Sequence, residues 1–130
     1  MFIHNEVSVP ELSTKNLNRK RFYQTPDGKL YPSITTVLQK RKMAGLMEWR
    51  KNVGDDVANY IARTAAHRGT KVHHMCEDFL NNNFDEETHK KNFLPYVLFG
   101  QMKPVLMQKV NNILAQECGL YTDKYRVAGR

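Results

Sequence analysis

The sequence predicts a helix-rich, mixed α/β fold, and two observations support this prediction. Apolar residues recur at helical spacing through much of the region 33–115. Short runs of strand-forming residues, separated by turn residues, lie on either side of that region. A chain of 130 residues is the size of one domain. We therefore expect a single domain with an arm at 1–20, a hairpin at 21–32, a helical region at 33–115 and the start of a central sheet at 117–130.

The segment at residues 21–33 predicts a β-hairpin. Its TPDG sequence, residues 25–28, has proline where a type I turn favours it and glycine where a left-handed residue must follow. Strand formers flank this turn on both sides, namely Phe22, Tyr23, Leu30 and Tyr31. The residues up to Leu17 are weakly patterned, and we expect them to form an arm or a peripheral strand.

Ser33 is expected to cap a short helix over ITTVLQKR, residues 34–41. The basic triplet Lys40, Arg41 and Lys42 would then lie in its last turn, where cations interact favourably with the helix dipole. Capping would account for the triplet without a ligand, but it does not exclude contact with phosphate.

A second helix is expected over about 45–67, with Gly54 as a possible point of interruption. Gly69 fits the position after that helix, and Thr70 fits the N-cap of a third helix over 71–82. The apolar positions of the second helix should face a core; they are Val53, Val57, Tyr60, Ile61 and Ala65.

A polar loop is expected at 81–87, followed by a further helical region that extends to about Ala115. Pro95 and Pro104 punctuate this region, and Pro104 should either begin a new helix or kink the existing one. After Gly119, the sequence LYTDKYRVAGR predicts two short strands.

The net charge of +7 is concentrated in one segment. Residues 14–51 contain ten Lys or Arg against two acidic residues, whereas all other residues contain ten against eleven. A basic surface can simply be solvated, but clustering of this kind favours a polyanionic partner such as nucleic acid.

No apolar run has the length that crosses a bilayer, and the N-terminus lacks a signal pattern. The sequence therefore predicts no membrane partner and a cytoplasmic location. Cys76 and Cys118 lack zinc-type spacing, and we expect them to be reduced rather than bridged.

The helix expected after Thr70 carries a candidate site. His73 and Glu77 are four residues apart and share a face at the margin of the apolar stripe, whereas His74 and Asp78 should point to solvent. An imidazole beside a carboxylate suits Mn²⁺ or Mg²⁺, although such a pair is also typical of a surface hydrogen bond. In a first helical turn, the dipole would keep His73 neutral and backbone N–H groups could bind phosphate. The stripe consists of Val72, Met75, Cys76, Phe79 and Leu80.

The segment ARTAAHRGTKVHHMCEDFL resembles the G-T-x-x-H helix of RecB-like PD-(D/E)XK nucleases, with matches at Gly69, Thr70, His73 and Glu77. Upstream, YPSITTVL and EWRKNVG resemble the first part of phage exonucleases and of the mitochondrial genome maintenance exonuclease. Downstream, VAGR resembles the start of the strand motif G-x-x-D.

This resemblance implies a metal-dependent DNA exonuclease that acts on single-stranded ends, with Mg²⁺ or Mn²⁺ at His73 and catalytic roles for His73, Glu77 and Glu117. In the family, the Asp of G-x-x-D and an acid of D/E-x-K hold the metal ion, and the lysine of the latter motif activates water. Together with the charge pattern, the resemblance predicts a set of DNA contacts: Lys40, Arg41, Lys42, Arg63, Arg68, Gly69, Thr70 and Lys71. Phe22, Tyr23 and Tyr31 would either stack on bases or pack within the hairpin.

Gly129 and Arg130 match the first two positions of G-x-x-D, and the sequence then stops. The metal-binding Asp is therefore not among these residues, and no D/E-x-K motif on a β-strand follows Gly129. We expect the chain to be the N-terminal portion of such a nuclease, inactive alone and prone to self-association because its apolar faces lack cover. For a phage protein the location would be the host cytoplasm.

Two alternatives remain. A non-catalytic single-stranded DNA-binding module would have the same basic segment but no metal-dependent cleavage. A helical protein-interaction domain would bind no nucleic acid, and its partner surface would involve Trp49, Met43, Met47, Met102 and Met107, although methionines at helical spacing are common in cores.

Overall fold

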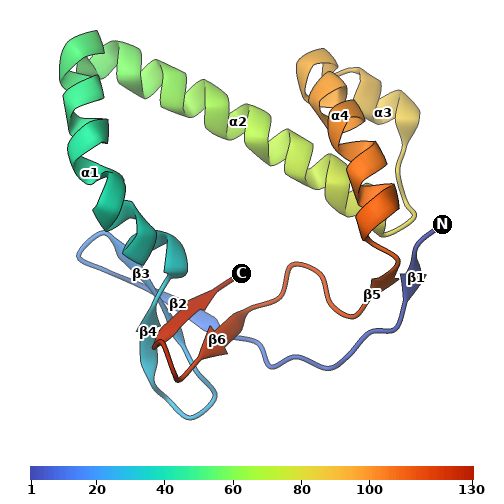
Figure 1. The fold of residues 1–130 in the computed structure, drawn as a ribbon, viewed down its shortest axis with the longest axis horizontal. Coiled ribbons are helices and arrows are strands. Elements are labelled where there is room, and N and C mark those ends of the chain that lie inside the picture. Colours follow the sequence, from blue (N-terminus) through green and yellow to red (C-terminus); the bar gives the residue numbers. More distant parts are fainter. The chain divides into compact units, whose positions relative to one another are not determined.

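The computed structural model describes all residues from Met1 to Arg130, and its fold is mixed α/β as predicted (Figure 1). The helices are α1 (Ile34–Val53), α2 (Asp55–Leu80), α3 (Glu86–Lys90) and α4 (Phe93–Lys109). The strands are β1 (Ile3–His4), β2 (Ser13–Leu17), β3 (Lys20–Gln24), β4 (Leu30–Pro32), β5 (Asn112–Ile113), β6 (Leu120–Thr122) and β7 (Val127–Gly129).

The chain folds into two units, and neither is a continuous segment. Unit 1 consists of Met1–Glu6 and Val53–Gln116, and it contains α2, α3, α4 and the β1–β5 pair. Unit 2 consists of Val7–Asn52 and Glu117–Arg130, and it contains α1 up to Asn52, the β2-β3-β4 sheet and the β6–β7 pair.

The predicted hairpin is confirmed in unit 2 and becomes part of a three-stranded antiparallel sheet. Its turn is closed by a 2.9 Å hydrogen bond from the Gly28 amide to the Thr25 carbonyl, and Gly28 has a φ of 85°. The peripheral strand expected near the N-terminus is β2, which pairs with β3 along its whole length. The two strands predicted after Gly119 are also confirmed, as the antiparallel β6 and β7.

Tyr23 and Tyr31 form the core of unit 2 with Ala128, and Leu12 packs against them. The two tyrosines are cross-strand partners in β3 and β4, so their rings lie on the same face of the sheet. The Tyr31 hydroxyl donates a hydrogen bond to the Asp123 carboxylate. Of the two roles proposed for these aromatics, packing is therefore correct for Tyr23 and Tyr31. Phe22 points to the opposite face and remains partly exposed.

Helix α1 corrects the prediction of a short helix at 34–41, because it continues without a break to Val53. The Ser33 cap is confirmed by a 3.2 Å hydrogen bond from the Thr36 amide to Ser33 Oγ. The basic triplet thus lies in the middle of a 20-residue helix, and the dipole explanation for it is wrong. The interruption at Gly54 is confirmed: its φ of 88° is a conformation that glycine adopts without strain, and it separates α1 from α2.

Replacing Ser33 with alanine should lower the free energy of unfolding of unit 2 by about 1 kcal/mol, because α1 loses its only side-chain cap while Ser33 is buried. Urea denaturation followed by circular dichroism measures the change. Ser13→Ala is the matched control, since Ser13 is exposed on β2. Equal losses in the two variants would contradict the capping role.

Helix α2 corrects a second boundary. Gly69 and Thr70 lie inside it, not at a helix end, and Gly69 has no left-handed φ. A glycine inside a helix costs about 1 kcal/mol relative to alanine, a cost that packing of α2 against α4 can outweigh. The apolar face expected at the start of α2 is also wrong, because Val57, Tyr60 and Ile61 are exposed and Ala58 is the buried residue there.

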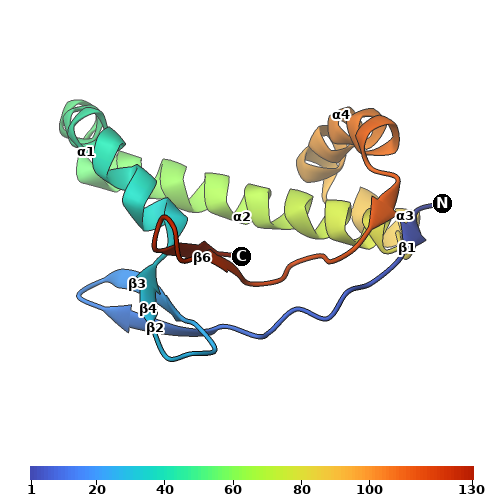
Figure 2. The same cartoon turned by 60° about the horizontal axis from the view of Figure 1, so that its bottom comes forward.

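The core of unit 1 lies where the C-terminal part of α2 meets α4 (Figures 1 and 2). Met75 and Phe99 are almost fully buried. The Phe79 ring contacts the rings of Phe2, Phe84 and Phe99 edge-on, at centroid distances of 5.2, 6.2 and 5.5 Å. The apolar stripe predicted for residues 72–80 therefore faces a core, as expected.

The rest of unit 1 differs from the prediction in detail. The loop expected at 81–87 is shortened by α3, whose N-cap Asp85 accepts a 3.2 Å hydrogen bond from the Glu87 amide. Helix α4 continues through Pro104, so no new helix begins there, and it ends at Lys109 instead of near Ala115. Strand β5 follows and pairs in parallel with β1. No helix of the chain is long and apolar enough to cross a membrane.

Candidate functional site

The charge asymmetry seen in the sequence follows the division into units. Unit 2 contains thirteen Lys or Arg and five Asp or Glu, a net charge of +8. Unit 1 contains seven and eight, a net charge of −1. The whole positive excess of the protein therefore belongs to the unit with the three-stranded sheet and α1.

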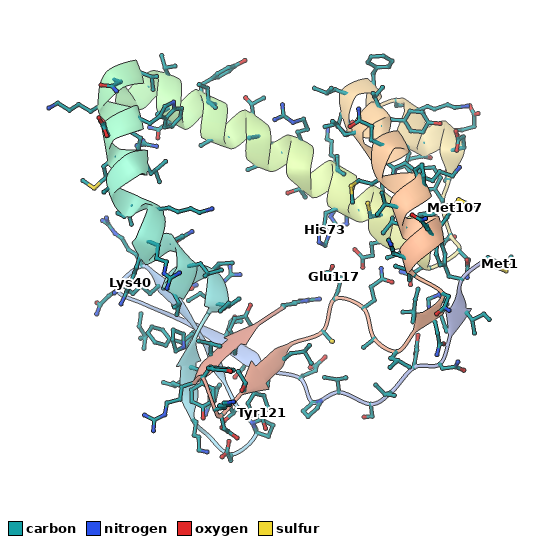
Figure 3. All side chains as sticks on the ribbon, in the orientation of Figure 1. Met1, Lys40, His73, Met107, Glu117 and Tyr121 are labelled. Carbon is teal, nitrogen blue, oxygen red and sulfur yellow. The ribbon has the colours of Figure 1, made fainter.

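Helix α1 presents much of this charge to solvent. It buries no residue, and Lys40, Arg41 and Lys42 are all exposed; Figure 3 labels Lys40 on this helix. Successive residues of a helix point about 100° apart, so the triplet spans roughly 200° of the helix surface. One straight nucleic-acid backbone can therefore contact about two of the three side chains. Lys51 is eleven residues after Lys40, about three turns, and lies on nearly the same side.

The outer face of the sheet is a second basic surface, which the sequence alone did not define. Lys15 is the cross-strand partner of Phe22, and Lys20 precedes Phe22 by two residues on the same strand. Residues opposite each other, and residues two apart on a strand, share a face. Phe22 is therefore the predicted stacking aromatic that remains partly exposed, and two lysines flank it.

The contacts predicted on α2 belong to unit 1. Arg63, Arg68 and Lys71 lie within about 140° of one another around the helix, with Arg63 and Lys71 exposed and Arg68 partly exposed. The Lys71 ammonium donates a 2.8 Å hydrogen bond to Asn92 Oδ1. The amides of Gly69 and Thr70 lie in the helix interior, where N–H groups bond to carbonyls four residues earlier. The predicted phosphate contact through these amides is therefore wrong.

His73 and Glu77 are on α2 as predicted, but their surroundings differ. His73, labelled in Figure 3, is exposed and lies in the last third of the helix, so the argument from a first-turn dipole is wrong. The Glu77 Oε2 atom lies 3.5 Å from Nδ1 of His74, which is largely exposed. Glu77 is thus an ion-pair partner for His74 when that imidazole is protonated.

Glu117, the third predicted catalytic residue, belongs to unit 2 and precedes β6 (Figure 3). It is partly buried and has a φ of 52°. Its backbone carbonyl accepts a 2.7 Å hydrogen bond from Nε of Arg130. Glu117 and Arg130 are therefore held together within unit 2.

No group of three or more His, Cys, Asp or Glu side chains is placed to hold a metal ion. The predicted donors of α2 are one imidazole and one carboxylate, fewer than the three protein ligands typical of a catalytic zinc site, although Mg²⁺ is often held by one or two carboxylates. His73 and Glu77 therefore form a partial donor set.

Sequence reasoning missed a partly buried polar pair in unit 1. Asp78 was expected to face solvent, but its Oδ2 atom is 2.8 Å from Nε2 of His89. The His89 ring stacks on Phe84 at a centroid distance of 4.5 Å. His89 lies beyond the expected polar loop, and no spacing in the sequence relates it to Asp78.

Both cysteines are free. Burial raises the pKa of the Cys76 thiol, which lies on the apolar stripe of α2. This thiol is therefore a weaker nucleophile near neutral pH than an ordinary cysteine.

No protein-family model, curated protein or solved structure matches the chain.

Proposed function

We propose that this chain binds single-stranded DNA through unit 2, and that it supplies the His73 helix and the basic unit of a metal-dependent DNA exonuclease. The observation that carries the proposal is the net charge of +8 on unit 2, compared with −1 on unit 1. Clustered Lys and Arg side chains release counterions from DNA when they neutralise its phosphates, and this release dominates nonspecific affinity.

The exposed side chains of unit 2 favour a single strand. Proteins that bind single strands combine a basic surface along the backbone with aromatic rings that stack on bases. The outer face of the sheet offers this combination, with Phe22 between Lys15 and Lys20. The exposed cations of α1 extend the basic surface of the same unit.

The exonuclease part of the proposal is supported by the motif matches at Gly69, Thr70, His73 and Glu77. Mg²⁺ or Mn²⁺ is the proposed cofactor and His73 the proposed ligand, with Glu77 and Glu117 as further acidic groups of the site. The Asp of G-x-x-D is not among the 130 residues, and no D/E-x-K motif on a β-strand follows Gly129. We therefore expect these residues to bind DNA without cleaving it.

The test is a pair of assays on the purified chain. Fluorescence anisotropy with a labelled single-stranded oligonucleotide in EDTA should show binding that weakens as salt rises. Addition of Mn²⁺ should produce no cleavage on a denaturing gel. Chelator-sensitive cleavage would show that an acidic centre forms from other residues, and absence of binding at low salt would refute the proposal.

In a protein that carries these residues followed by both acidic motifs, His73→Ala should lower Mn²⁺-dependent cleavage by about 100-fold while DNA binding in EDTA persists. His67→Ala is the matched control, because His67 is exposed on the same helix. His74→Ala is less suitable, since His74 lies beside Glu77. Equal losses from the His67 and His73 variants would remove His73 from the site.

A non-catalytic single-stranded DNA-binding module is the second candidate, and the same charge asymmetry favours it. Cleavage by a longer protein that carries both acidic motifs would distinguish the exonuclease from this binding module.

A protein partner, or a second copy of the chain, is the third candidate. It is favoured by the exposed apolar side chains of α1, among them Leu38, Met43 and Met47. Sedimentation of the chain over a range of concentrations tests self-association.

A further inference from the structure

Unit 2 contains a polar cavity of about 530 Å³ on the inner face of its sheet. The segment 9–12 and the segment 117–119 form part of its wall. Two arginines, Arg21 and Arg130, are among the residues that line it, as are Glu11 and Glu117. Neither arginine was among the predicted DNA contacts.

The two arginines are held in place by the surrounding strands. Arg21 is two residues before Tyr23 on β3, so both side chains leave the inner face of the sheet. Arg130 follows β7, and its Nε atom donates a 2.7 Å hydrogen bond to the Glu117 carbonyl. That bond fixes the plane of the guanidinium group and leaves its two terminal nitrogens for another acceptor.

Glu11 and Glu117 are also among the lining residues, and their negative charges oppose the entry of an anion. A free anion would therefore be held weakly. A phosphate that is part of a strand is favoured, because other cations of unit 2 bind further phosphates of the same strand and raise its effective concentration.

We propose that this cavity holds one backbone phosphate of a single DNA strand between Arg21 and Arg130. A guanidinium group presents a planar fork of N–H donors that matches two phosphate oxygens, which makes arginine better suited to this task than lysine. The inference rests on the proposed DNA binding by unit 2. It assigns Arg21 and Arg130 as positioning residues for the strand.

The experiment measures single-stranded DNA affinity at several salt concentrations for Arg21→Gln, Arg130→Gln and the double variant. The double variant should flatten the slope of log affinity against log salt by about 0.7, the value for one lost phosphate contact on a single strand, and each single variant should flatten it by a part of this. Arg126→Gln is the matched control, since Arg126 is exposed in the turn between β6 and β7. Glu11→Gln should tighten binding, because it removes an opposing charge from the cavity.

Arg130→Lys distinguishes a lost contact from a folding defect. It keeps the charge and loses the fork, so it should retain most of the salt slope and weaken affinity. If Arg21→Gln, Arg130→Gln and Arg126→Gln all change the slope equally, the cavity assignment is wrong while DNA binding by unit 2 stands. If the unmodified chain binds no oligonucleotide, the proposed function itself fails. Saturable shifts of the arginine Nε–H signals with inorganic phosphate, without any response to an oligonucleotide, would assign the cavity to a free ion and overturn the strand assignment.

Discussion

Replacing Phe99 with alanine should lower the free energy of unfolding of unit 1 by about 3–5 kcal/mol. Phe99 is 2% exposed, and its ring stacks on Phe84 at a centroid distance of 4.6 Å and meets Phe79 edge-on at 5.5 Å. Truncation would leave a cavity in the contact between α2 and α4. Urea denaturation followed by circular dichroism measures the loss.

Phe93→Ala provides the control, because it is the same substitution on the same helix. Phe93 is 77% exposed at the start of α4, and its replacement should change the free energy of unfolding by no more than about 0.5 kcal/mol. Comparable small effects at both positions would mean that α4 does not pack on α2 as described.

Replacing Lys40, Arg41 and Lys42 together with glutamine should flatten the salt dependence of single-stranded DNA binding by about 1.4. A slope change of roughly two would require all three side chains to touch the backbone. Because the triplet spans roughly 200° of α1, two contacts are the geometric expectation. Melting of unit 2 should change little, since the triplet lies in mid-helix and contributes no capping.

A matched triple substitution in unit 1 tests whether location matters or only total charge. Lys90, Lys91 and Lys109 are exposed there, and their joint replacement with glutamine removes the same charge from the protein. We expect the salt slope to stay within about 0.3 of the original, less than half of the 0.7 for one contact. Equal slope changes from the two triple variants would show attraction by net charge alone.

The hairpin and the last two strands could be predicted because their signals are local. Proline and glycine at 25–28 fix the chain reversal within four residues, and turn residues likewise separate β6 from β7. The boundaries of the helices were harder to predict from the sequence. Gly69 and Thr70 are good end signals, but α2 continues through them because its later residues pack on α4. Tertiary packing of this kind cannot be predicted from a short segment of the sequence, because it depends on residues far apart in the chain.

In the candidate site, too, local features could be predicted from the sequence and long-range contacts could not. The location of the basic surface follows from where lysine and arginine occur, so it was predictable. The sequence could not predict whether Glu77 lies beside His73 or His74, because residues three and four apart are both neighbours on a helix. The Asp78–His89 pair and the arginines at 21 and 130 meet only through folding, and no periodicity relates them.

The interleaving of the two units has a consequence for how the protein is made. Strand β1 pairs with Asn112–Ile113, so it must wait until about 110 further residues have been made. At about 5–20 residues per second, that delay is roughly 5–20 s. In unit 2, the hydroxyl of Tyr31 donates its hydrogen bond to Asp123, which is made 92 residues later. Each unit joins segments that are far apart in the sequence, so the nascent chain keeps apolar side chains in contact with water until the later segment of each unit has been made.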